Sequence, residues 1–208
     1  MTSFRLELPK EEPPDDLAQP VLDFLCRKDG GVRGGALNHW TRVAVGTNVE
    51  RGDQEGGSEE IRRAIGTYRA TGTRLHSTHH LTLLAQVLAA CGHYGEGLTA
   101  LREAAALVEE TGERYLEAEI RRLEGNLLLA ENGSAEAEAC YLKALEVARA
   151  QEARSLELRA AGDLARLWAG QDRRSEARDL LAPVYGCFTE GFDTADLKEA
   201  KALLDELT

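Results

Sequence analysis

EGLTALREA at residues 96–104, EAEACYLKA at 136–144 and EARDLLAPV at 176–184 are copies of one pattern, each displaced by 40 positions from the one before. In every copy a small residue is followed four positions later by a large apolar residue, and three positions later by another small or β-branched one. With a further copy upstream, the three columns hold Gly57, Gly97, Ala137, Ala177; Ile61, Leu101, Tyr141, Leu181; and Ala64, Ala104, Ala144, Val184. These spacings put each set on one face of a helix, with small residues where another backbone comes close.

A second set of columns precedes each copy. Its small members are Val45, Ala85, Gly125 and Ala165, and it ends at a column of turn-forming residues, Gly52, Gly92, Asn132 and Asp172. Gly, Asn and Asp supply the backbone geometry that stops a helix and begins a turn. Each 40-residue unit is therefore predicted to be a helix, a short turn and a second helix.

Repeated helix pairs predict an all-α fold, a right-handed α-solenoid of about four 40-residue pairs with a C-terminal capping helix. We expect residues 1–35 to form a flexible segment with a degenerate helix, and residues 36–208 to form the repeat domain. The expected helices are 36–51 and 56–72, 77–91 and 94–111, 114–131 and 134–150, 154–170 and 173–188, and the cap Thr194–Leu207.

The chain resembles the tetratricopeptide repeat, here lengthened from about 34 residues to 40. Three segments are similar in sequence to the C-terminal repeats of bacterial multidomain regulators: 67–75 (TYRATGTRL), 106–130 (ALVEETGERYLEAEIRRLEGNLLLA) and 136–151 (EAEACYLKALEVARAQ). In those proteins a class III nucleotide cyclase or a DNA-binding domain, with a STAND-type ATPase, precedes the repeats. The resemblance implies a noncatalytic repeat module of a regulatory or signalling protein.

Motifs for catalysis are missing from the sequence. The run from Gly30 to Gly35 lacks the lysine of a phosphate-binding loop, and no GxSxG, HExxH or GxGxxG pattern occurs. We therefore expect no enzyme activity and no cofactor. His76, His79 and His80 are the one set to weigh as metal ligands, since 76 and 80 share a helix face. Histidines that line a groove are the alternative, and no metal is assigned.

The charge of the chain limits its partners. It has 25 Lys and Arg against 36 Asp and Glu, a formal net charge of −11. Nucleic acids and anionic membranes favour basic proteins, so neither is an expected partner. The sequence has no run of about 18 apolar residues and no apolar core of a signal peptide, which predicts a cytoplasmic protein.

The repeat resemblance implies a concave groove formed by the first helix of each pair. A groove of this kind predicts a protein-protein interaction scaffold, and the alternative is a small-ligand sensor domain of a STAND or cyclase-type regulator. The unit around Asn48 is the weakest match, so self-association through the N-terminal repeat is also considered. The predicted groove positions are His39, Arg42, His79, Thr82, Gln86, Glu119, Arg122, Asn126, Arg159, Asp163 and Arg166.

Arginine is in excess among these positions. Three arginines face Glu119 and Asp163, and guanidinium groups bind carboxylates through paired hydrogen bonds. The sequence thus predicts a protein or peptide partner that is acidic or presents a free carboxylate. Replacing Arg122 and Arg159 with Ala is expected to weaken binding with little change in melting temperature. A solvated helix face with local ion pairs is the alternative interpretation.

Overall fold

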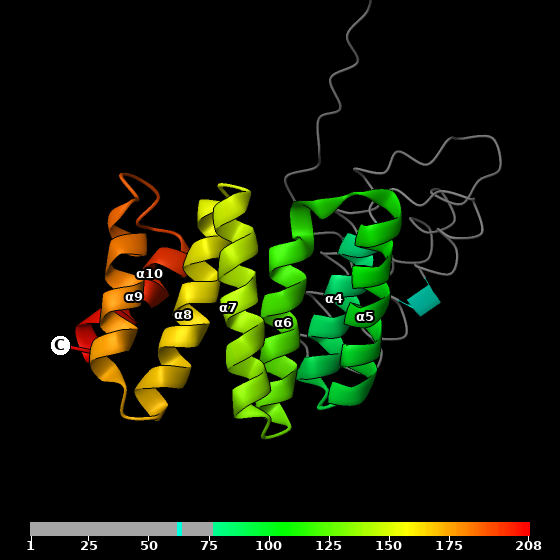
Figure 1. Ribbon diagram of the computed structural model, residues 1–208, viewed down its shortest axis with the longest axis horizontal. Coiled ribbons are helices and arrows are strands. Elements are labelled where there is room, and N and C mark those ends of the chain that lie inside the picture. The colour runs from blue at the N-terminus through cyan, green and yellow to red at the C-terminus, as the bar shows by residue number, and fades with distance from the viewer. Residues whose placement is uncertain (1–61, 64–76) are drawn as a thin grey trace, which may run out of the picture.

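The computed structural model describes residues 62–63 and 77–208, and every regular element in this part of the chain is helical. The helices lie side by side along the long axis of the molecule (Figure 1). Arg62 and Arg63 are helical, whereas segment 1–35 and the rest of the predicted pair 36–51 and 56–72 lie outside the described residues. The elements are α4 (Ser77–Ala90), α5 (Tyr94–Thr111), the 3-10 turn η1 (Arg114–Leu116), α6 (Glu117–Ala130), α7 (Ser134–Ala150), α8 (Arg154–Gly170), α9 (Arg174–Gly186) and α10 (Ala195–Glu206).

This arrangement confirms the predicted all-α repeat fold, with three helix pairs and a further helix in the described part. The one clear departure is the predicted helix 114–131. Its first turn is a 3-10 turn, because Leu116 has φ −104° and ψ 4° and leaves the α-helical region, so that α6 begins at Glu117.

The turns inside the pairs repeat with the sequence. Gly92, Asn132 and Asp172 have φ of 77°, 70° and 63°, so the predicted turn column adopts the left-handed conformation in all three copies. A second left-handed column, not anticipated, joins one pair to the next: Gly112 has φ 74° and Glu152 has φ 53°. Gly, Asn and Asp adopt this region at low cost, which explains why they occupy the turns inside the pairs.

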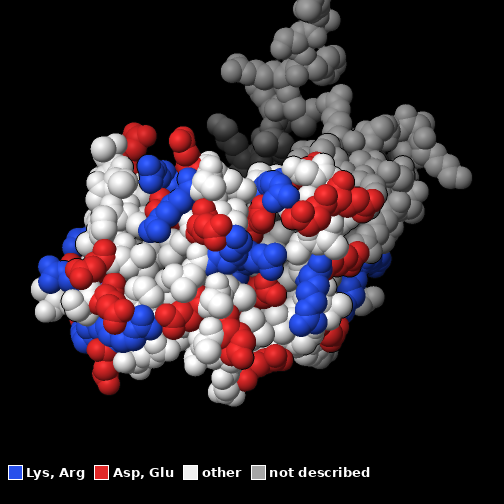
Figure 2. Space-filling view, in the orientation of Figure 1, with Lys and Arg blue, Asp and Glu red and all other residues white. Residues whose placement is uncertain are grey.

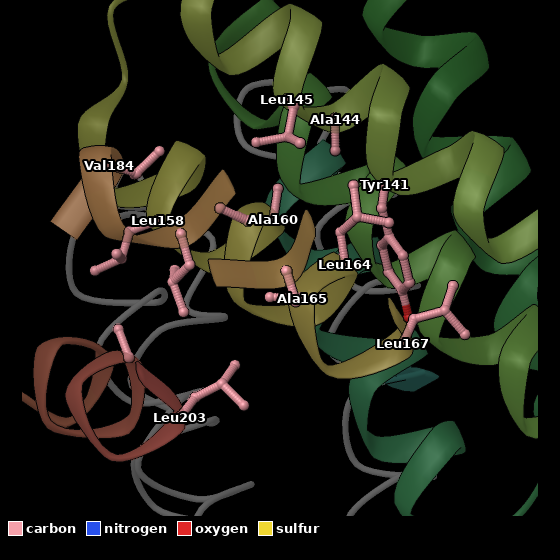
Figure 3. Packing of buried hydrophobic residues seen from close by; sticks show 14 of the residues in the cluster. Tyr141, Ala144, Leu145, Leu158, Ala160, Leu164, Ala165, Leu167, Val184 and Leu203 are labelled. Carbon is pink, nitrogen blue, oxygen red and sulfur yellow. The ribbon is translucent and has the colours of Figure 1, made fainter. Parts of the chain in front are cut away.

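The small-residue columns form a buried contact between helices. We call this contact the seam and define it as Gly97, Ala104, Gly125, Ala137 and Ala144. Ala104, Ala137 and Ala144 are 0% exposed. A Cβ on Gly125 would lie 2.6 Å from Cε1 of Tyr141, and a Cβ on Gly97 would lie 3.0 Å from Cδ1 of Leu127. Packing therefore excludes a larger side chain at Gly125 and leaves little room for one at Gly97. Tyr141 itself lies beside Leu164 and Leu167 in the core (Figure 3).

Helix α10 covers the end of the stack. It contacts α8 and α9 and buries Leu197, Ala200, Leu203 and Leu207 at its amphipathic face. Thr194 precedes the helix in an extended conformation and is its N-cap residue. Within 62–63 and 77–208, no helix has the length and apolar character needed to cross a membrane.

Candidate functional site

A groove of about 470 Å³ runs across the first helix of each described pair and ends at α10. Its side walls come from α4 and α10, and its floor comes from α6 and α8. We use the name groove for the space lined by His79, Thr82, Leu83, Gln86, Leu116, Glu119, Arg122, Leu156, Leu158, Arg159, Gly162, Asp163, Arg166, Asp196, Glu199 and Ala200.

The predicted groove positions fall largely in this lining. His39 and Arg42 lie outside the described residues. Asn126 does not line the groove, and the other described positions do: His79, Thr82, Gln86, Glu119, Arg122, Arg159, Asp163 and Arg166. The repeat register thus brings these side chains together, and whether they bind a partner remains a prediction.

Arg122 is held between two carboxylates in the floor of the groove. Its Nε and one terminal nitrogen donate to the two oxygens of Glu119 at 2.9 and 2.7 Å, and its other terminal nitrogen donates to Oδ2 of Asp163 at 2.6 Å. The side chain is only 15% exposed, and those of Glu119 and Asp163 are 7% and 15% exposed. Burial opposes the charge of Arg122, but the two carboxylates outweigh this and raise the pKa of its guanidinium.

Asn126 belongs to the same network for a structural reason. Its side-chain amide lies 2.7 Å from the hydroxyl of Tyr141. When the amide nitrogen faces Tyr141, it also donates to Asp163 at 3.2 Å and its oxygen accepts from Arg122 at 3.1 Å. Burial and the negative charge of Asp163 raise the pKa of Tyr141, so this phenol stays neutral in the core. Asn126 therefore positions the floor instead of facing a ligand.

Two charged groove residues that sequence reasoning missed come from α10. Asp196 accepts from Nε of Arg159 at 2.8 Å, and Glu199 accepts from Arg166 at 3.1 Å. Arg166 also donates to Asp163 at 2.8 Å. The lining therefore carries four carboxylates against three guanidinium groups. The arginine excess predicted from the sequence is corrected by this finding, because α10 supplies two further negative charges.

The 40-residue period of the sequence would have predicted that Asp196 and Glu199 line the groove. One more step of 40 from Arg159 reaches Glu199, and one more step from Leu156 reaches Asp196. Helix α10 thus takes the place of the first helix of a following unit. Interpreted only as a cap, this helix was not predicted to line the groove with one of its faces.

The two described histidines of the predicted cluster point to different surroundings. His79 lines the groove, whereas His80 is 4% exposed, and their ring centroids are 6.2 Å apart. His76 lies outside the described residues. In the part of the chain that the structure describes, no three His, Cys, Asp or Glu side chains gather in a way that could hold a metal ion.

The rest of the described surface is mixed in charge. On the face shown in Figure 2, acidic and basic side chains are interspersed among the described residues, without a broad area of one sign. Pairs such as Lys143 with Glu146, at 2.8 Å, lie one helical turn apart on α7. Exposed pairs of this kind contribute little to stability and favour no particular partner.

Comparison with known proteins supports the fold. No family model and no curated protein matches the chain. Among solved structures, BtubC (BKLC) from P. vanneervenii superposes with a TM-score of 0.70 at 17% identity, covering 90% of this chain and 83% of that one. The nearly identical TPR-like repeats of a protein from Podosopora anserina named as a putative kinesin light chain give 0.61 at 17% identity, covering 81% and 84%. A variant of those repeats with one substituted residue gives 0.63 at 16% identity, with the same coverage. At these identities the likeness shows the fold alone, a TPR-like repeat solenoid.

Proposed function

We propose that this chain is a noncatalytic protein-interaction scaffold that binds a peptide segment in the groove. The observation that carries the proposal is the groove itself, which crosses four helices and is lined by both polar and apolar side chains. A segment of a partner protein can lie along such a surface and contact several helices at once. The likeness to TPR-like repeats is consistent with this role.

A phage library of random linear peptides, panned on the full chain, tests the proposal. A Gln86→Trp variant places a bulky indole in the groove at an exposed position of α4 and should abolish binding of the selected peptides. The matched control is Gln171→Trp, which makes the same change at the turn between α8 and α9, outside the groove. Peptides that bind both variants equally would place the binding site elsewhere.

A small-ligand sensor is the second candidate, because about 470 Å³ lies within the size range of small-molecule pockets. A metabolite panel screened by thermal shift separates the two. A sensor should show a metabolite that raises the melting temperature of the wild type and not that of Gln86→Trp. A scaffold should respond to selected peptides alone.

The finer assignments follow from the sequence resemblance. We propose that the chain is the repeat module of a regulatory protein, related to repeats that accompany cyclase and STAND ATPase domains, and that it acts in the cytoplasm. The adjoining coding sequence should then encode such a domain. The purified chain should neither hydrolyse ATP nor form a cyclic nucleotide. Self-association through the N-terminal repeat predicts a dimer in light scattering.

A further inference from the structure

Gly162 is a helical glycine that packing does not require. It is buried near the middle of α8 and lines the groove, yet a Cβ built on it would meet a single atom within 4 Å, a terminal nitrogen of Arg166 at 3.8 Å. Gly125 differs, since its Cβ would strike Tyr141 at 2.6 Å. Glycine is disfavoured in a helix interior relative to alanine. Gly162 therefore keeps open a space that no described residue of the chain fills.

The groups around this space carry unused hydrogen-bonding capacity of both kinds. Arg159 and Arg166 lie one turn before and one turn after Gly162 on the same helix face. Arg159 bonds Asp196 through Nε, and among the described residues its terminal nitrogens donate no hydrogen bond. Asp196 and Glu199 each have one oxygen bonded to an arginine and one that accepts nothing from the described part of the chain. Donors and acceptors thus face the space together.

The α4 side of the groove lining has no Lys, Arg, Asp or Glu. Helix α4 contributes His79, Thr82, Leu83 and Gln86 to the groove, and the Gln86 side-chain amide, exposed, makes no hydrogen bond within the described residues. Leu83, Leu116 and Leu156 add apolar surface. Every guanidinium in the lining is already paired with a carboxylate. A ligand therefore meets paired charges with an excess of one carboxylate, free amide-like donors and acceptors, and apolar side chains.

We propose that Gly162 marks the closest approach of an extended peptide that is recognised by its main-chain amides and one apolar side chain, and not by net charge. The inference rests on the proposed function and names the chemistry of its partner. A peptide backbone offers alternating donors and acceptors, which match the unused groups of Arg159, Asp196 and Gln86. The missing Cβ allows that backbone to come close to α8.

Random linear peptides of about 12 residues, selected on phage and then synthesised, are the probe. Their affinity for the full chain is measured by fluorescence anisotropy against wild type, Gly162→Ala, Gly162→Leu and Gln86→Trp. Gly95→Ala and Gly95→Leu are matched controls, because Gly95 is an exposed glycine of α5, outside the groove, with nothing within 4 Å of its Cβ position.

We expect affinity to fall by about threefold in Gly162→Ala and by more than about 30-fold in Gly162→Leu, with the Gly95 variants unchanged. Gly162→Ala should also melt at a higher temperature than wild type, because alanine favours the helix. The selected peptides should have little net charge and share an apolar residue. Their affinity should change by less than about threefold between about 50 and about 500 mM salt.

Failure of the inference is distinct from failure of the proposed function. If Gln86→Trp abolishes binding while Gly162→Leu binds like wild type, the groove binds peptides but Gly162 is not the point of approach. Strongly charged peptides whose affinity falls more than about tenfold over that salt range would also overturn the inference. If no peptide is selected, or if Gln86→Trp changes nothing, the proposed function itself fails, and the inference with it.

Discussion

The seam and the groove are built from the same helices by opposite means. In the seam, Gly and Ala let backbones approach, and Ala104, Ala137 and Ala144 are completely buried. In the groove, long charged side chains of α6, α8 and α10 span the space and form ion pairs with one another. Two glycines show the contrast: Gly125 leaves no room for a Cβ, whereas Gly162 leaves room that none of the described side chains occupies. Close packing of small residues therefore holds the helices together in the seam, and ion pairs hold them together in the groove.

The comparison is sharpened most by removing Arg122, whose side chain is only 15% exposed in the groove floor. Arg122→Ala leaves Glu119 and Asp163 without their shared cation, and we expect a loss of about 3 kcal/mol in the free energy of unfolding. This differs from the sequence-based expectation of a nearly unchanged melting temperature, because the side chain is 15% exposed. Urea unfolding measures the effect.

The adjacent Arg121→Ala is the control for that experiment. Arg121 is 38% exposed and pairs with Glu124 at 3.0 Å on the surface of α6, so its loss should cost at most about 0.5 kcal/mol. Equal losses for Arg121 and Arg122 would mean that the groove floor behaves as an ordinary solvated surface.

Overpacking the seam is the next largest effect. Ala144→Leu adds three carbon atoms to a site that is 0% exposed, and it should lower the free energy of unfolding by about 2 kcal/mol. Ala139→Leu makes the same change at an exposed position of the same helix and should change stability little. Comparable melting shifts for the two variants would overturn the assignment of the seam.

Tyr141 connects the two regions, since its ring lies against Gly125 in the seam and its hydroxyl bonds Asn126 below the groove. Tyr141→Phe should cost about 1 kcal/mol at neutral pH through the lost hydrogen bond. Urea unfolding at neutral pH measures this loss.

The same residue makes stability depend on alkaline pH. Its pKa is raised on folding, so its contribution is complete below the unfolded value of about 10 and is lost as pH rises above it. Wild type should therefore lose more stability than Tyr141→Phe between about pH 9 and about pH 11. Parallel pH profiles would show that the phenol is not held neutral by burial.

The smallest expected effect on stability is that of an ion pair outside both the seam and the groove. Lys143 and Glu146 form a pair at 2.8 Å in which the side chains are 50% and 69% exposed. Lys143→Ala should change the free energy of unfolding by no more than about 0.5 kcal/mol, and the effect should disappear in high salt. A larger loss in thermal melts would show that surface pairs contribute to the stack as much as buried ones.

Much of this fold was predictable because each repeat contains its own sequence signals for helices and turns. The columns at Gly97, Ala137 and Ala177 and the turn residues Asn132 and Asp172 are local signals, each repeated, so the helix limits could be placed closely. The groove positions followed from the same register. The charge balance did not, because it depends on Asp196 and Glu199 in a helix interpreted as a cap, whose side chains reach back to α8. The role of Asn126 was also hidden, since only packing shows Tyr141 beside it.

Because α10 follows the other described helices in the chain, the ribosome synthesises it after them. Ribosomal synthesis delivers α4, α6 and α8 before α10, and each helix pair folds chiefly against its sequence neighbours. Until residues 195–206 emerge from the ribosomal tunnel, Arg159 and Arg166 have no α10 carboxylates to meet. A nascent chain therefore presents groove arginines whose α10 partners are still absent, and the groove gains two negative charges when α10 packs on α8.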